Sequence, residues 1–134
     1  MLNTRVVMAA SSLVLLIGGV VCLFLPTEAL SVLGFPAQSA VVGQMIGALY
    51  LGFAAANWTA RGSMIGGIYA RPLSVANFVH FVVGGTVLAK GITGSTLNFA
   101  YLAVTLGYAV FAVLFVLVLY GRLERVGGAE SSRQ

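Results

Sequence analysis

The sequence has very few charged residues. Of its 134 residues only 7% are charged, and Asp and Glu together number three. A soluble domain carries about 25% charged residues, so this chain has too few of them to cover a surface that faces water. The acidic residues are Glu28, Glu124 and Glu130, and all three stand outside the long apolar segments. We therefore expect a chain that lies mostly in lipid and has no paired carboxylates for acid–base catalysis.

The sequence also has only one cysteine and one histidine, and it has no cluster of basic residues. Cys22 is the only cysteine, which excludes an intrachain disulfide and a Cys-x-x-Cys metal site. His80 is the only histidine, so one chain cannot hold a haem between two histidines. No acidic residue stands in the spans to complete a catalytic triad with it. The net charge of +4 is spread along the chain, without the basic cluster of a nucleic-acid site. We expect no enzyme, no cofactor, no metal site and no nucleic-acid partner.

Long apolar segments, in contrast, are abundant. Hydrophobic residues make up 60% of the chain, and the mean hydropathy is +1.04. About 20 residues of α-helix, at 1.5 Å per residue, cross a hydrocarbon core of ~30 Å. The sequence therefore predicts an all-α integral membrane four-helix bundle. It forms a single domain over 1–134, with a polar tail at 121–134 and spans at about 5–25, 41–59, 72–90 and 98–120.

A short interfacial helix is predicted between the first two spans, over residues 27–34. Pro26 ends the first span. Thr27 is the predicted N-cap, Glu28 suits the positive end of the helix dipole, and Gly34 favours termination. The alternative, that the first segment is a cleaved signal peptide, is disfavoured because signal h-regions are only about 7–15 residues long.

The distribution of Lys and Arg predicts the orientation of the chain. In a four-span topology Lys90 stands alone on one side, and six arginines fall on the other: Arg5, Arg61, Arg71, Arg122, Arg125 and Arg133. By the positive-inside rule both termini are expected in the cytoplasm. Arg61 and Arg71 are expected to contact anionic headgroups. The alternative is that they clamp an anionic ligand.

Polar residues inside the spans fall at matched depths. Tyr50, His80 and Tyr108 lie near the span centres, Asn57 and Asn77 nearer the cytoplasm, and Tyr101 nearer the outside. A polar group left unpaired in hydrocarbon costs several kcal/mol. We therefore expect a polar seam between the second, third and fourth spans, with the first span packed outside it. These six residues are the candidate ligand-binding residues, and the alternative is that they only hydrogen-bond the helices together.

Several short motifs stand in order along the first 90 residues: Pro26-x-x-Ala29-Leu30-x-x-Leu33-Gly34, Gly47-Ala48-Leu49-Tyr50-Leu51-Gly52-Phe53, Asn57-Trp58-x-Ala60-Arg61-Gly62, Gly66-Gly67-Ile68-Tyr69-x-Arg71-Pro72 and Asn77-Phe78-x-His80. In this combination they resemble a family of small uncharacterised four-span bacterial membrane proteins. The resemblance implies a four-span architecture in a bacterial inner membrane, and it carries over no activity.

Three hypotheses of function follow. The first is a non-catalytic membrane protein, either an accessory or assembly subunit of a membrane complex or a small homo-oligomer. Its partners would be the lipid bilayer and other membrane subunits or a second copy of itself. The second is a binder or carrier of a lipophilic small molecule in the polar seam. The third is a haem- or quinone-binding redox subunit that uses His80.

Overall fold

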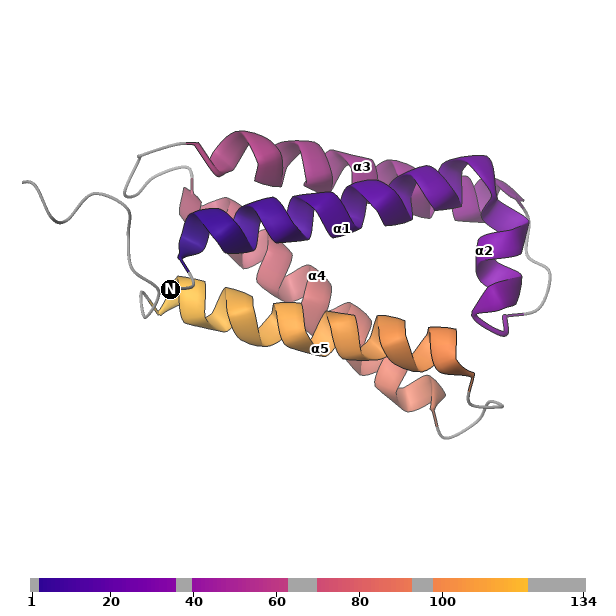
Figure 1. Cartoon of the computed structure of the whole chain (residues 1–134). Coiled ribbons are helices and arrows are strands. Elements are labelled where there is room, and N and C mark those ends of the chain that lie inside the picture. The colour runs from indigo at the N-terminus through magenta and orange to yellow at the C-terminus, as the bar shows by residue number, and fades with distance from the viewer. Residues whose placement is uncertain (1–2, 36–39, 63–69, 93–97, 121–134) are drawn as a thin grey trace, which may run out of the picture.

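The computed structural model describes residues 3–35, 40–62, 70–92 and 98–120. The predicted tail at 121–134 and most of the connection between the second and third spans lie outside the described residues. Within them the chain is helical throughout, as Figure 1 shows. In order the helices are α1 (Thr4–Phe24), α2 (Pro26–Val32), α3 (Ala40–Ala60), α4 (Ala70–Gly91) and α5 (Phe99–Leu119).

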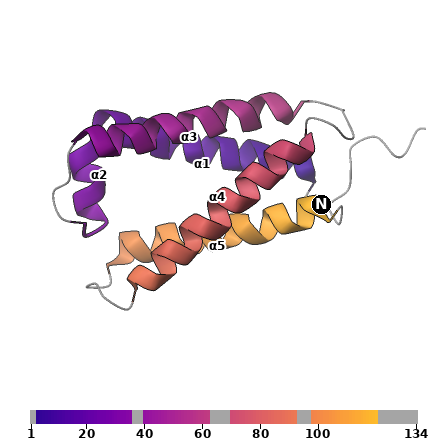
Figure 2. The same cartoon turned by 180° about the vertical axis from the view of Figure 1, so that it is seen from behind.

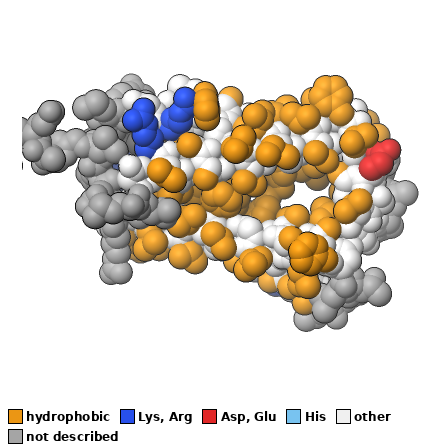
Figure 3. Space-filling view, viewed as in Figure 1, with side chains coloured by type: hydrophobic (Ala, Val, Ile, Leu, Met, Phe, Trp, Pro, Cys, Tyr) orange, Lys and Arg blue, Asp and Glu red, His pale blue; other side chains and the backbone are white. Residues whose placement is uncertain are grey.

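Four of these helices, α1, α3, α4 and α5, are long and apolar enough to cross a membrane. The bounds of these helices agree with the predicted spans to within two residues at either end. The surface agrees with this, since large apolar side chains such as Ile17, Leu49 and Leu106 are exposed on the outward faces. Figure 3 shows the same apolar covering along the front of the molecule. This surface suits lipid, which is as apolar as the side chains it touches.

The four long helices form two pairs. Helix α1 packs on α3, and α4 packs on α5, whereas the two pairs touch each other much less. Figures 1 and 2 show that the pairs approach at one end and splay apart toward α2. A hollow is visible between α1 and α5 in Figure 3. Helix α2 lies at the splayed end, and the Asn98 side chain of α5 donates a hydrogen bond of 2.9 Å to the Val32 carbonyl oxygen.

The α1–α3 pair depends on glycine at the contact. A Cβ atom added to Gly47 would lie 2.8 Å from the Gly19 carbonyl oxygen and 2.9 Å from the Leu23 nitrogen. A Cβ atom on Gly43 would lie 2.6 Å from the Pro26 Cβ. Any side chain at these two positions would hold the backbones apart. The spacing Gly43-x-x-x-Gly47, which favours close helix contact, is thus occupied within the same chain, by α1 at Gly47 and by Pro26 of α2 at Gly43.

The α4–α5 pair is an aromatic stack. The Phe81 ring is buried and lies 5.0 Å from the Phe111 ring and 5.8 Å from the Phe115 ring, between centroids. The Tyr108 ring lies over Gly84, where no side chain stands in its way. Aromatic pairs at such separations contribute about 0.5–1.5 kcal/mol beyond the area they bury.

The helix ends confirm some local predictions and correct one. Asn98 caps α5 as predicted, because its side chain accepts from the Tyr101 amide. Gly34 follows α2 with a φ of 80°, which favours glycine. The prediction that Thr27 caps α2 is wrong. The helix starts at Pro26, and the Thr27 hydroxyl instead donates to the Glu28 carboxylate at 2.9 Å. Proline at the first helical position needs no partner for a missing N–H.

The first span is part of the core, so the expectation that it packs outside the polar seam is wrong. Ser11 and Ser12 are both buried, at 0% and 4% exposure. The Ser12 hydroxyl donates to the Ala54 carbonyl oxygen of α3 at 2.7 Å. Serine reaches a neighbouring backbone only at very close helix approach, which the glycines of this pair permit.

Candidate functional site

An amide clamp, formed by Asn57 of α3 and Asn77 of α4, joins the two helix pairs where they approach. Both residues are fully buried. The Asn57 amide nitrogen donates to the Asn77 side-chain oxygen at 2.8 Å, and the Asn77 amide nitrogen donates back at 2.7 Å. The second hydrogen on Asn57 goes to Ser11 at 3.0 Å, and the second on Asn77 goes to the Leu73 carbonyl oxygen at 2.9 Å.

This arrangement uses all four amide hydrogens of the clamp within the protein. Asn57 and Asn77 were predicted to lie at one depth and to face each other, and they do. The clamp connects α1, α3 and α4. Its amides have no hydrogen left to donate to a ligand, so its geometry favours the helix-packing interpretation for these two residues.

A second polar cluster lies near the middle of the helices. The hydroxyl groups of Tyr50 on α3 and Tyr108 on α5 are hydrogen-bonded to each other. The Tyr108 hydroxyl also lies 3.3 Å from Nε2 of His80 on α4. The Phe53 ring stacks on the imidazole with centroids 5.1 Å apart. The structure thus brings together Tyr50, His80 and Tyr108 from the three helices of the predicted seam.

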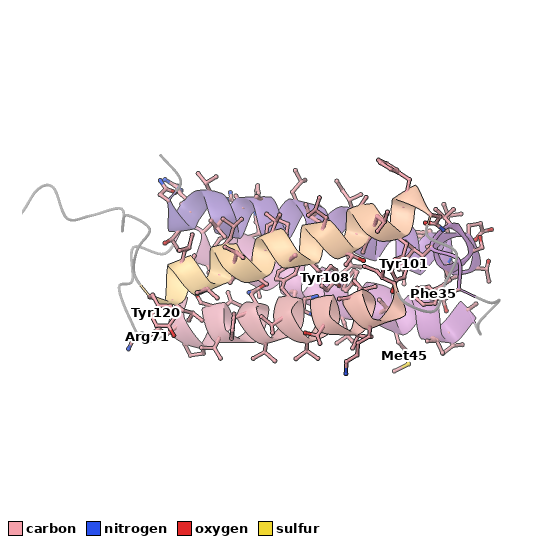
Figure 4. The ribbon with its side chains drawn as sticks, turned by 90° about the horizontal axis from the view of Figure 1, so that it is seen from below. Phe35, Met45, Arg71, Tyr101, Tyr108 and Tyr120 are labelled. Atoms are coloured by element: carbon pink, nitrogen blue, oxygen red, sulfur yellow. The ribbon has the colours of Figure 1, made fainter. Side chains whose placement is uncertain are left out.

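Tyr101, the remaining predicted site residue, lies elsewhere. It is buried, and its hydroxyl donates to the Leu88 carbonyl oxygen of α4 at 2.7 Å. Its ring faces Phe35, with 6.0 Å between centroids. Figure 4 shows Tyr101 and Phe35 together near α2, apart from Tyr108. Tyr101 therefore fastens α5 to α4 and does not join the His80 cluster.

An apolar groove, which we call the α3–α4 groove, opens where the two helix pairs diverge. Its volume is about 590 Å³. The lining is apolar apart from backbone and consists of Met45, Ala48, Leu49, Gly52, Phe53, Ala56 and Leu73. Phe53 is a wall of the groove on one side and covers the His80 ring on the other. The groove therefore lies directly beside the central polar cluster.

Sequence reasoning missed this groove. A signal was present, because Ala48, Gly52 and Ala56 recur every four residues and make a second small-residue stripe on the second span. Gly47 and Gly43 are covered by α1 and by Pro26 of α2, respectively. The second stripe is open, since a Cβ atom added to Gly52 would have no neighbour within 4 Å.

Two arginines stand at the end of the molecule where the amide clamp lies. The Arg61 guanidinium lies 3.0 Å over the Trp58 ring, and it donates to the Trp58 carbonyl oxygen at 3.2 Å. Arg71 is exposed in the first turn of α4. In Figure 4 the side chains of Arg71 and Met45 project on the same side of the molecule, at opposite ends.

The described residues include no group of three or more His, Cys, Asp or Glu side chains that could hold a metal ion. What they do define is a multi-pass helical membrane protein with two internal polar clusters and a groove between α3 and α4 on its apolar outer surface. Comparisons with protein-family models, with curated proteins and with solved structures gave no match. The resemblance to a family of four-span bacterial proteins therefore stays a prediction.

Proposed function

We propose that this chain is a non-catalytic protein of a bacterial inner membrane, with both termini in the cytoplasm, that binds a lipophilic small molecule. The observation that carries the proposal is the α3–α4 groove. It opens on the outer surface of the helix pairs, so a molecule dissolved in the bilayer reaches it without crossing water. The orientation is supported by the six arginines that fall on one side against Lys90 on the other.

The proposed site differs from the predicted one. The sequence predicted a ligand in the polar seam, whereas we propose that it lies in the groove beside the seam. Lipid tails are as apolar as the groove wall, so burial alone gives little preference for one apolar molecule over another. Selection has to come from shape and contact. Gly52, Ala48 and Ala56 provide the depth, and Phe53 provides a rigid wall backed by the His80 ring.

The same groove bears on the two other hypotheses. For a homo-oligomer, the Gly43–Gly47 motif is already used against α1 and Pro26 of the same chain, so the free small-residue stripe is the one in the groove. For a haem ligand, His80 is crowded by Tyr50, Phe53, Phe81 and Tyr108, and its Nε2 is within hydrogen-bonding distance of Tyr108. We therefore favour the small-molecule site, and a transmembrane helix in the groove is an outcome that its test detects.

The Gly52→Leu variant tests the groove, with Gly107→Leu as its matched control. Both glycines lie in spanning helices with nothing within 4 Å of an added Cβ atom, but only Gly52 lines the groove. The probe is a palmitic acid analogue that carries a diazirine, photolysed in nanodiscs and mapped by peptide mass spectrometry. We expect adducts concentrated on the segment from Met45 to Ala56. Gly52→Leu should reduce them about tenfold, an amount that corresponds to about 1.4 kcal/mol of binding, and Gly107→Leu should leave them unchanged.

Adducts spread over all four spans in proportion to their lipid exposure would contradict a defined site. Equal labelling of Gly52→Leu and Gly107→Leu would also contradict a defined site. A dimer of the chain in native mass spectrometry that Gly52→Leu abolishes, together with few probe adducts on α3, would instead support the oligomer. Thermal melting of both variants in detergent checks that each retains its fold.

A further inference from the structure

We propose that the ligand of the α3–α4 groove is a neutral carbonyl compound that lies at the centre of the bilayer. Its carbonyl oxygen accepts a hydrogen bond from the central polar cluster of Tyr50, His80 and Tyr108. This inference rests on the proposed function and names the chemical class of ligand for the same site. Its support is the number of polar hydrogens in the cluster, the contact of the cluster with the groove and the depth at which both lie.

The central polar cluster has one more hydrogen than the described part of the chain accepts. Tyr50, Tyr108 and a neutral imidazole on His80 carry one polar side-chain hydrogen each. Among the residues that the structure describes, these side chains make two hydrogen bonds, Tyr50 with Tyr108 and Tyr108 with His80. Whichever group donates in each bond, one hydrogen is left without an acceptor. An unpaired polar group in hydrocarbon costs several kcal/mol, so an acceptor on a ligand is stabilised here.

The His80 ring has an edge that a ligand atom can reach. Its Nε2 atom lies 3.3 Å from the Tyr108 hydroxyl, and Nδ1 has no hydrogen-bond partner within the described ranges. His80 is half-buried, and the described residues contain no fully buried side-chain nitrogen or oxygen that lacks a partner. Nδ1 therefore keeps exposed surface. When Tyr108 donates to Nε2, the hydrogen without an acceptor is the one on Nδ1.

His80 also borders the groove. The Phe53 ring lines the groove and stacks on the imidazole with centroids 5.1 Å apart. Leu73, the groove residue of α4, stands seven residues before His80, and seven residues are close to two helical turns. Leu73 and His80 thus share one face of α4. A ligand that packs on Phe53 reaches the imidazole past the edge of that ring.

The depth of the cluster restricts the class of ligand. Tyr50 is ten residues from either end of α3, which is about 15 Å of helical rise. The groove extends to both sides of that depth, from Met45 to Ala56. The ester groups of a phospholipid stand at the edge of the ~30 Å hydrocarbon core, about 15 Å from its centre. They do not reach the cluster, so its acceptor has to belong to a molecule that enters the core.

Such a molecule has to be uncharged. A carboxylate at the bilayer centre costs about 3 kcal/mol or more, and the groove lining has no cation to offset that cost. A carbonyl oxygen accepts a hydrogen bond without carrying a charge. A lipid-soluble ketone or quinone meets these conditions, whereas a plain hydrocarbon leaves the hydrogen of the cluster unpaired.

The test compares two photoreactive probes, a hexadecane with a terminal diazirine and the same chain with a ketone at its middle. Each is doped into phosphatidylcholine nanodiscs that hold the full-length protein. Adducts on the segment from Met45 to Ala56 are expressed relative to adducts on the rest of the protein. We expect the ketone to label this segment about fivefold more than the hydrocarbon, which corresponds to about 1 kcal/mol of binding.

The Tyr50→Phe/His80→Phe/Tyr108→Phe variant removes the polar hydrogens and keeps a ring at each position. It should abolish the excess, so that both probes label the segment equally. Tyr101→Phe is the matched control and should keep the excess, since the Tyr101 hydroxyl donates to the Leu88 carbonyl oxygen outside the cluster. A second measurement needs no substitution. With protein in excess, the carbonyl stretching frequency of an isotope-labelled ketone should fall below its value in empty nanodiscs, because a hydrogen bond weakens the C=O bond.

The two proposals fail differently. Equal groove labelling by both probes, with the groove still labelled more than other surfaces, would overturn the carbonyl site and leave the proposed function standing. Labelling with no preference for the groove would remove both. An excess of ketone labelling that survives the triple substitution, or that Tyr101→Phe also abolishes, would overturn the role of the cluster. An unshifted carbonyl frequency would do the same.

Discussion

Replacing Asn57 with leucine is expected to lower the free energy of unfolding by about 2–4 kcal/mol, one of the two largest effects that we predict. Leucine has the same branching at Cγ as asparagine, although it is larger, so the change removes the hydrogen bonds and keeps the shape of the side chain. Asn77 would be left fully buried, with an amide hydrogen and a carbonyl oxygen deprived of their partners. Unfolding in mixed micelles with a rising fraction of dodecyl sulfate measures the loss.

The Asn57→Leu/Asn77→Leu double variant is the control that separates hydrogen bonding from packing. With both amides gone no partner is left unpaired, because Ser11 keeps its bond to the Met8 carbonyl oxygen. We expect the double variant to be less destabilised than the sum of the two single variants, and close to either one alone. Additive losses would show that the clamp contributes through packing and not through paired amides.

Gly47→Val is expected to destabilise the α1–α3 pair by about 2–4 kcal/mol, because overpacking at a backbone contact leaves no flexible atom to move. The Cβ atom alone would overlap the Gly19 carbonyl oxygen and the Leu23 nitrogen. Gly52→Val is the matched control on the same helix, where an added Cβ atom has no neighbour within 4 Å. The same dodecyl sulfate titration compares them.

Because both variants place valine in α3, the difference in helix propensity cancels between them. We expect Gly52→Val to unfold within about 0.5 kcal/mol of the unchanged protein, as surface substitutions do. Equal destabilisation of the two variants would mean that α1 does not approach α3 as closely as the structure shows.

The sequence was sufficient for the elements of this fold because each depends on local chemistry. Span length follows from apolar composition, and the start of α5 follows from Asn98 as a cap. Depth was also predictable, since helical rise places Asn57 with Asn77 and Tyr50 with His80 and Tyr108. The polar groups then meet at those depths, as the cost of leaving them unpaired requires.

Which helices lie side by side could not be predicted from local sequence in the way that span bounds and depths could. Any two spans with small-residue faces can pack, and the order around a bundle depends on which pair fits best. The hydrogen bond between Ser11 and Asn57 could not be predicted without knowing that α1 is the neighbour of α3. The groove was harder still to predict. It exists where one helix face has no neighbouring helix, and the sequence of a single span does not show which of its faces lacks a neighbour.

The position of the amide clamp has a mechanical consequence. It lies near the end where the helix pairs meet, so it acts as a pivot for the angle between them, and the bond from Asn98 to Val32 limits that angle at the far end. Bilayers of different thickness favour different helix tilts. A thinner membrane would spread the two pairs about the pivot, and a thicker one would draw them upright. We therefore expect the width of the groove to change with the thickness of the membrane around it.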